Sequence, residues 1–426
     1  MTAPSFLPTE IVSLIIQHAD AQDLKACTLV NKQFCTVAQP LILWRTIHLK
    51  RKNKRAGYQM INQIVTAHPS VGHHIRHLDL GSSYTWKDDA LLLLMPHVRL
   101  LETLILRNAE QLTDVSLEHL PRHCPELRSL DVGNSRITTI SFDALRQFCP
   151  HLWQLTLGTT TKDLAADAFV GLGSPCRLKA LVLNLEHYED DDDEDGGGGF
   201  FEEDDPADPF CLTGFHHLTH LTIHHGPMRM LERLFPTYDG DDGDDPAVAR
   251  FALPALTHLT LYDCPNVVDE MLVPFLETHP DLQSLEVYGS GDLCDGTLEA
   301  IAEFIPNIRN VRIDDNINIT HHGLRQLVRR CRLLTTVSCA NTEINAEEIP
   351  EAGEHCLNLM VSEDEDIYLE WLDEDAIDTI RKDKPEDEVN SNNNNDADAD
   401  DDDNNDYGSD DGYDDDDEFD DDDDDE

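Results

Sequence analysis

Residues 124–152 read CPELRSLDVGNSRITTISFDALRQFCPHL, and the Cys-Pro-x-Leu junction at the start of this stretch returns at its end. Between the junctions, residues 127–132 alternate apolar and polar side chains, as a short strand does. A turn at Ile137 and Thr138 follows, and residues 141–149 carry apolar side chains at helical spacing up to Pro150. The stretch therefore predicts a strand–turn–helix unit, and its returning junction predicts further copies.

The unit recurs along most of the chain, and each copy opens with an apolar residue followed three and five positions later by others, as in Leu127, Leu130 and Val132. The ten openers are Ile75, Leu101, Leu127, Leu152, Leu178, Leu218, Leu256, Leu282, Ile308 and Leu334. They stand 25 or 26 residues apart, except for steps of 40 after Leu178 and 38 after Leu218, which contain insertions. A unit of this size buries its apolar stripe only by stacking on its neighbours. The fold class predicted is an α/β solenoid with a parallel sheet on the concave side and helices on the convex side.

The Cys-Pro-x-Leu junctions and the turns at residues 112–114 and 319–320 resemble the cysteine-containing class of leucine-rich repeat, from residue 75 to about 360. Four cysteines stand three residues before an opener or its expected place: Cys124, Cys149, Cys331 and Cys356. This placement follows the repeat and favours buried, reduced thiols. A protein of the cytoplasm, the nucleus or both is expected.

The formal net charge of −54 is concentrated in three short segments. Residues 386–426 hold 24 acidic side chains and no basic ones, residues 189–208 hold 12, and residues 239–245 hold 5. The rest of the chain carries −13, which argues against nucleic-acid binding. No signal peptide or membrane span is expected. One dense basic run could serve nuclear import, act as a solvated linker or dock the acidic tail: Lys50, Arg51, Lys52, Lys54 and Arg55.

The first fifty residues predict three helices: one at residues 9–15, one at 23–30, and one at 40–47 beginning at Pro40. This segment resembles the F-box, through Leu7, Pro8, Glu10, Ile11, Ile15, Asp23, Leu24, Cys27, Leu29, Val30, Asn31, Lys32, Phe34, Leu43, Trp44 and Arg45. F-box proteins dock on the Skp adaptor of a cullin-RING ubiquitin ligase. The resemblance implies that adaptor contacts and F-box core are shared among Leu7, Pro8, Ile11, Leu29, Val30 and Trp44, without separating the two. An ordinary helical cap for the solenoid is the alternative.

Residues two, four and six positions after each opener should face outward from the concave side. This rule selects candidate substrate contacts at His77, Arg107, His220, His258, Tyr262, Glu286, Tyr288 and Arg312. Tyr262 and Tyr288 occupy the same position in adjacent repeats and should stand side by side. The histidines between residues 216 and 225 lack a thiol or carboxylate to complete a metal site. Neither a catalytic constellation nor a cofactor is predicted.

The expected domains are an F-box-like unit at residues 5–50, a basic linker and entry to the solenoid at 51–74, the solenoid with its C-terminal cap at 75–385, and a disordered acidic tail at 386–426. Acidic insertions are expected at 189–209 and 237–247. These features favour a non-catalytic substrate receptor of an SCF-type ubiquitin ligase, which binds the Skp adaptor and an unknown protein substrate. The alternatives are an acidic leucine-rich-repeat nuclear protein that binds histones or other basic proteins, a GTPase regulator resembling the activator of Ran, and a degenerate F-box acting outside ubiquitination.

Overall fold

The computed structural model describes residues 7–17, 21–49, 54–67, 71–81, 86–107, 109–158, 177–185, 212, 215–226, 228–235, 253–342, 344–358 and 367–382. The chain divides into two compact units, Met1–Lys382 and Asp383–Glu426, and all described residues belong to the first. The expected insertions at 189–209 and 237–247 and the expected tail at 386–426 lie outside the described residues.

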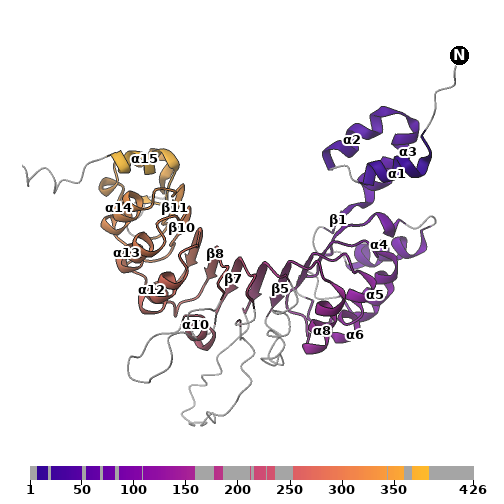
Figure 1. Ribbon diagram of the computed structural model, residues 1–426, viewed down its shortest axis with the longest axis horizontal. Helices are drawn as coiled ribbons and strands as arrows, with labels where there is room; N and C mark the ends of the chain where they lie inside the picture. Colours follow the sequence, from indigo (N-terminus) through magenta and orange to yellow (C-terminus); the bar gives the residue numbers. More distant parts are fainter. Residues whose placement is uncertain are drawn as a thin grey trace, which may run out of the picture. The chain divides into compact units, whose positions relative to one another are not determined.

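A twelve-stranded sheet runs through the first unit (Figure 1). Its strands are β1 (Thr46–His48), β2 (His77–Asp79), β3 (Thr103–Ile105), β4 (Ser129–Val132), β5 (Gln154–Gly158), β6 (Ala180–Asn184), β7 (His220–His224), β8 (His258–Tyr262), β9 (Ser284–Tyr288), β10 (Asn310–Arg312), β11 (Thr336–Ser338) and β14 (Trp371–Leu372). They lie in chain order, and each of β2 to β11 begins two residues after an opener. All ten openers are buried. The predicted fold class is confirmed.

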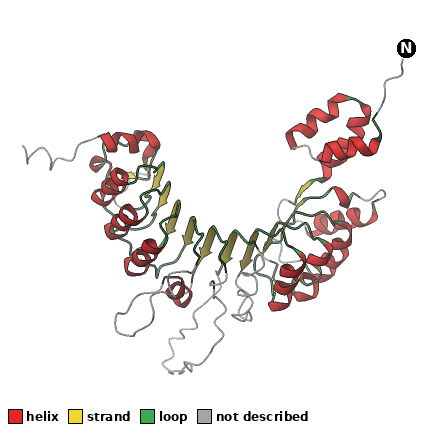
Figure 2. Cartoon of the chain, viewed as in Figure 1, coloured by secondary structure: helices red, strands yellow, loops and turns green. Residues whose placement is uncertain are grey.

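Helices lie along one face of the sheet and leave the other face open (Figure 2). In the described part of the chain, the helices between β1 and β14 are α4 (Lys54–Thr66), α5 (Asp88–Leu94), α6 (Asp114–Leu117), α7 (Leu120–His123), α8 (Thr139–Phe148), α10 (Met228–Leu234), α12 (Asp269–Thr278), α13 (Asp295–Phe304) and α14 (His321–Arg330). Short 3₁₀ helices occur at η1 (Gly72–His74), η2 (Met95–His97), η4 (Ala346–Glu348) and η5 (Glu354–Cys356). One continuous apolar core fills the space between the sheet and the helices.

A residue with positive φ follows the strand in six repeats, always seven positions after the opener. These residues are Asn134, His225, Asp263, Gly289, Asp315 and Asn341. Asn, Asp and Gly adopt this left-handed conformation more readily than other residues. The chain therefore turns away from the sheet at the same height in each of these repeats, which aligns the ends of the strands.

Aspartates at the first position of a helix join neighbouring repeats. Asp114 opens α6 and accepts hydrogen bonds from the Thr138 amide (2.9 Å), the Thr138 hydroxyl (2.6 Å) and the Ser141 hydroxyl (2.5 Å) of the next repeat. The same arrangement joins Asp88 to Thr113 and Ser116, Asp269 to Cys294 and Thr297, and Asp295 to Thr320. The amides at the start of a helix have no partner within that helix. Each carboxylate accepts a hydrogen bond from one such amide in the next repeat, where water would otherwise bind.

The cysteines at the repeat junctions are buried thiols, and no disulfide joins the nine cysteines in the described part of the chain. The Cys124 thiol donates to the Val98 carbonyl, and the Cys149 thiol donates to the Cys124 carbonyl, both at 3.6 Å. Burial raises the pKa of Cys124 to about 12. Because the thiolate is the nucleophilic form, the protonated Cys124 sulfur is chemically inert and serves in packing.

The N-terminal unit consists of α1 (Thr9–Gln17), α2 (Ala21–Val30) and α3 (Lys32–Trp44). The prediction that the third helix begins at Pro40 and reaches Ile47 was wrong at both ends. The Asn31 side chain accepts a hydrogen bond from the Phe34 amide (2.9 Å), so the helix starts at the asparagine and continues through the proline. Residues 46–48 instead form β1, which pairs in parallel with β2.

The segment at 51–74, expected as a linker and entry, contains helix α4. Its residues Ile61 and Ile64 are buried in the main core, so the helix covers the start of the solenoid. Strands β12 (Leu357–Asn358) and β13 (Tyr368–Leu369), together with α15 (Glu374–Lys382), form the C-terminal cap. Within this cap, β14 pairs antiparallel with β11, and Arg381 donates to carbonyls at and beyond the end of α14, those of Val328, Cys331 and Leu334.

Candidate functional site

Among the described side chains of the N-terminal three-helix unit, three apolar residues are fully buried and six large ones are exposed. Its fully buried apolar residues are Val12, Ile16 and Ala38. Its exposed large apolar residues are Leu7, Ile11, Leu14, Ile15, Leu29 and Val30. Several exposed large apolar side chains in one small domain indicate a contact site for another molecule.

The six predicted adaptor contacts separate into two groups. Leu7, Pro8, Ile11, Leu29 and Val30 are exposed, with Leu29 the most exposed at 87%. Trp44 is partly buried and packs against the main solenoid core. Gln33 holds the start of the unit in place, because its side-chain amide donates to the Leu7 carbonyl at 2.6 Å.

Sequence reasoning left Leu14 and Ile15 out of the adaptor set. A helical wheel places Ile11 and Ile15 four residues apart on one face, and Val12 and Ile16 on the next. Both faces are apolar, so sequence alone does not indicate which one is buried. The packing of Val12 and Ile16 against α3 resolves this and turns Leu14 and Ile15 outward.

The open face of the sheet carries an aromatic row that crosses three strands. His224, Tyr262 and Tyr288 are paired in register on β7, β8 and β9. The rings of His224 and Tyr262 stack with their centres 4.6 Å apart, and those of Tyr262 and Tyr288 stack at 4.1 Å. The Arg312 guanidinium lies 4.3 Å from the centre of the Tyr288 ring and extends the row onto β10. The side-by-side tyrosines expected from the repeat register are therefore present.

Polar partners hold the far end of the aromatic row. The Tyr288 hydroxyl donates to Glu286 at 3.3 Å, and the Arg312 Nε donates to Asp314 at 2.5 Å. Asp314 is almost fully buried and also accepts from the Ser338 hydroxyl at 2.7 Å. Burial, with the hydrogen bond to Tyr262 and the charge of Glu286, raises the pKa of Tyr288, which stays a neutral phenol. The row is thus built in advance of any ligand.

A second stack lies beside the aromatic row at the opposite ends of the strands. The imidazoles of His220 and His258 are 4.0 Å apart and nearly parallel. Burial lowers the pKa of both histidines, and the charge of His220 lowers that of His258 further. Both rings are therefore neutral at pH 7, and the stack avoids the repulsion that two imidazolium ions would cause.

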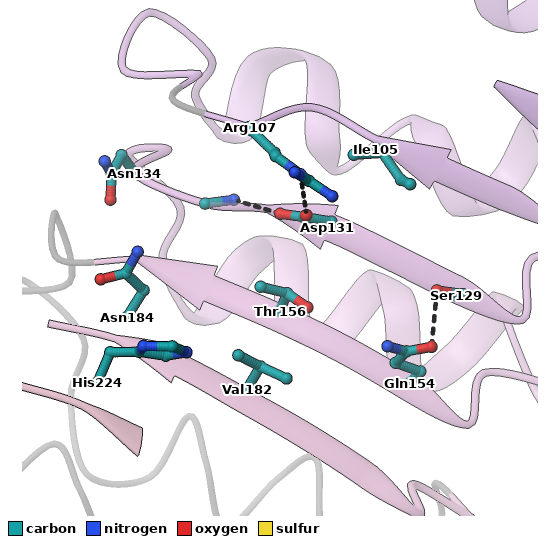
Figure 3. Close-up of a pocket in the computed structure, with 11 residues that line it drawn as sticks. Ile105, Arg107, Ser129, Asp131, Asn134, Gln154, Thr156, Val182, Asn184 and His224 are labelled. Carbon is teal, nitrogen blue, oxygen red and sulfur yellow. Dashed lines mark hydrogen bonds and ion pairs between the residues drawn. The ribbon is translucent and has the colours of Figure 1, made fainter. Parts of the chain in front are cut away.

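A polar hollow of about 560 Å³ lies on the open face next to the aromatic row (Figure 3). It is lined by Ile105, Arg107, Ser129, Asp131, Gly133, Asn134, Gln154, Thr156, Val182, Asn184 and His224. His224 belongs to both features, so the hollow and the row form one continuous surface from β3 to β10. Side chains from five strands meet in this hollow with only two aliphatic members, Ile105 and Val182.

Asp131 and Arg107 form the charged part of the polar hollow, 3.5 Å apart. Burial raises the pKa of Asp131, while the Gly133 amide and Arg107 act in the opposite direction. Asn134 comes close to the end of β5 because Gly158 has no side chain: a Cβ there would stand 2.1 Å from the Asn134 nitrogen. Gly158 thus allows the rim of the hollow to close.

The eight predicted substrate contacts fall into three places. His220, His258, Tyr262, Glu286, Tyr288 and Arg312 lie together on β7 to β10. Arg107 lies in the polar hollow. His77 stands apart on β2, where its ring nitrogen bonds the Thr103 hydroxyl at 3.0 Å.

Sequence reasoning missed most of the hollow's lining, although the alternation rule that selected Arg107 also gives Gln154, Thr156, Val182 and Asn184. These residues were passed over because only the largest side chains were chosen. Asn134 follows from a different signal, its position in the turn after β4.

Metal-ligand side chains gather away from the open face. The histidine-rich segment at 216–225 contributes to no close group of three potential ligands within the described ranges. One such group does occur in the described part of the chain, in the C-terminal cap: His355, Cys356 and Asp373. No helix among the described residues is long and apolar enough to span a membrane.

Comparison with known proteins assigns the N-terminal unit. Residues 5–50 match a family model described as F-box-like, so the chain carries an F-box-like domain ahead of a leucine-rich-repeat solenoid. No curated protein sequence matches the chain.

Solved structures that are similar to the chain include three at low sequence identity. A chain of the yeast Rad7 and Elc1 complex has 13% identity and a TM-score of 0.39, over 78% of this chain and 69% of that one. An internalin (InlF) from Listeria monocytogenes has 17% identity and a TM-score of 0.33, over 59% and 57%. A chain of the TLR13–ssRNA13 complex has 11% identity and a TM-score of 0.37, over 64% and 35%. The repeat assignment rests on the strand register and not on these similarities.

Proposed function

We propose that this protein is a non-catalytic substrate receptor of an SCF-type ubiquitin ligase, with the F-box-like domain bound to a Skp adaptor. The observation that carries the proposal is the exposed apolar surface of that domain. Among the described side chains of this domain, three apolar residues are fully buried and six large ones are exposed, and a partner that covers the exposed set would stabilise the domain. The match of residues 5–50 to an F-box-like family supports the adaptor as that partner.

The open face of the sheet is the proposed substrate site. The polar hollow offers hydrogen-bond donors and acceptors, while the aromatic row offers rigid rings of the kind that dominate protein interfaces. Holding adaptor and substrate on one chain raises the local concentration of substrate lysines near a charged ubiquitin-conjugating enzyme. The receptor needs no catalytic residue for this role.

Co-purification of the full chain with the Skp adaptor tests the proposal. The intact chain should retain the adaptor, and a Leu7→Ala, Pro8→Ala double variant should lose it. Val115→Ala is the matched control, because Val115 is an exposed apolar residue on α6, outside the F-box-like domain. No retention by the intact chain would reduce the domain to a cap for the solenoid.

A second activity is proposed for the acidic segment at 386–426. Its 24 carboxylates without a basic side chain favour binding of basic proteins such as histones. Pull-down of histones at physiological salt, with the full chain beside a chain ending at residue 385, measures it directly. Equal retention by both chains would contradict this activity and leave the receptor proposal untouched.

A further inference from the structure

The C-terminal cap brings together an imidazole, a thiol and a carboxylate. Ligand atoms of His355, Cys356 and Asp373 all lie within 4.8 Å of one another. His355 and Cys356 end the short helix η5, whereas Asp373 directly precedes α15. The cluster therefore joins two segments that are separated in the chain by β12, β13 and β14.

The Cys356 sulfur is buried and accepts hydrogen bonds from the backbone. Its donors are the amides of Asp373 and Gly353. The Cys356 carbonyl accepts from the Glu370 amide at 3.0 Å, so the backbone that carries the thiol is also fixed. These donors fix the direction of the sulfur, while burial raises the pKa of the Cys356 thiol, so a metal ion must displace its proton on binding.

The two carboxylate oxygens of Asp373 have different partners. Its Oδ1 accepts from the Ala376 amide in the first turn of α15 (2.8 Å), and its Oδ2 faces the His355 Nε2 at 2.6 Å. These two contacts orient the Asp373 carboxylate toward the cluster.

The His355 ring is positioned by its neighbours although its side chain is 61% exposed. It lies against Gly353, where an added Cβ would stand 2.8 Å from the ring carbon Cε1. Its other contact is edge-to-face with Trp371, at 5.6 Å between ring centres. The exposed imidazole leaves one side of the cluster facing solvent.

We propose that His355, Cys356 and Asp373 form a zinc-binding site that fastens the C-terminal cap. Nitrogen, thiolate sulfur and carboxylate oxygen are the ligands that Zn²⁺ takes in proteins, at about 2.0–2.3 Å. Tetrahedral coordination at these lengths separates ligand atoms by roughly 3.3–3.8 Å, so the His355 nitrogen and the Asp373 oxygen move apart by about 1 Å when the ion enters. Binding releases the Cys356 proton to solvent, and water or a partner's side chain takes the fourth position.

Cobalt substitution in the full chain tests the site. Chelator-treated protein is titrated with Co²⁺ in excess Mg²⁺, which occupies carboxylate-only sites. One equivalent of Co²⁺ should produce a thiolate-to-metal charge-transfer band, and one equivalent of Zn²⁺ should abolish it. Cys356→Ser and His355→Ala should each remove the band.

Two control variants keep the other potential ligands in place. Cys35→Ser changes a partly exposed thiol in the F-box-like domain, and His322→Ala changes an exposed imidazole on α14. Both should retain the band. Zinc should also slow amide hydrogen exchange in α15 of the wild type and not of His355→Ala. Absence of the band in the wild type, or its persistence in Cys356→Ser, would show that the cluster is only a His355–Asp373 ion pair. Adaptor binding is independent of either result.

Discussion

Replacement of Asp114 by alanine should destabilise the solenoid by about 3 kcal/mol. The change removes three hydrogen bonds to the next repeat, and each bond to a charged group contributes about 1.5–3 kcal/mol when both partners are well placed. The Thr138 hydroxyl recovers part of this loss because it is partly exposed and can bond water. The Ser141 hydroxyl is buried and is left with a desolvation cost of about 1–3 kcal/mol. Asp114→Asn keeps one acceptor oxygen and should cost about half as much.

Urea unfolding followed by circular dichroism measures the total loss for Asp114→Ala, and hydrogen exchange locates it. Amides of α6 and α8 should exchange faster, while those of α13 and α14 should not change. The control is Asp143→Ala on α8, because Asp143 is exposed and forms a surface ion pair with Arg146 at 2.9 Å. That variant should lose less than about 0.5 kcal/mol. Equal losses for Asp114→Ala and Asp143→Ala would refute the inter-repeat role of Asp114.

Three further perturbations probe the adaptor surface, the histidine stack and the cap. Leu29→Ala should weaken adaptor binding by about 2 kcal/mol, roughly 30-fold in the Kd measured by calorimetry. The thermal midpoint should not change, because Leu29 is exposed in the free chain. An unchanged Kd would exclude Leu29 from the interface. The pKa of His258 is lowered by burial below its usual 6.5, so its neutral form stabilises the fold above that pH, and this contribution is lost as the pH falls through 6.5 towards the folded value. Wild type should therefore lose stability relative to His258→Asn between pH 7.5 and 5, whereas parallel unfolding curves would contradict the shift. Arg381→Ala removes the donor to three carbonyls, so it should lower the stability of the cap by about 2–3 kcal/mol and speed hydrogen exchange throughout α15. Unchanged exchange would show that α15 is held by its apolar face alone.

The repeat solenoid could be predicted from the sequence because the residues that define its period must be buried in the core. Each opener, such as Leu127 or Leu256, is buried two residues before a strand begins. Replacing any of them with a polar residue would expose the core that two repeats share. Ten copies of the opener define the same strand register. The side-by-side placement of Tyr262 and Tyr288 was therefore predictable.

The ends of the array were harder to predict because each end is built only once. Nothing in the residues 46–48 distinguishes a strand from the last turn of a helix until β2 is present to pair with them. Pro40 indicates a helix start by its own chemistry, yet the Asn31 cap lies earlier and overrides it. The polar hollow was missed because the largest outward-facing side chains were chosen one at a time, whereas Asn184 and Gln154 form a site only when stacked strands bring them together.

The reversal of strand direction at β14 limits how this protein can change its length. Internal repeats present matching upper and lower faces, with an aspartate on one side and a capping threonine or cysteine on the other. A whole unit could be duplicated or deleted there while each surviving junction keeps its partners. At β11 the next position is taken by an antiparallel strand, so a further parallel unit has no edge to join. Lengthening or shortening is therefore confined to the interior of the array, and the spacing between the two termini of the sheet can be altered while its end structures remain the same.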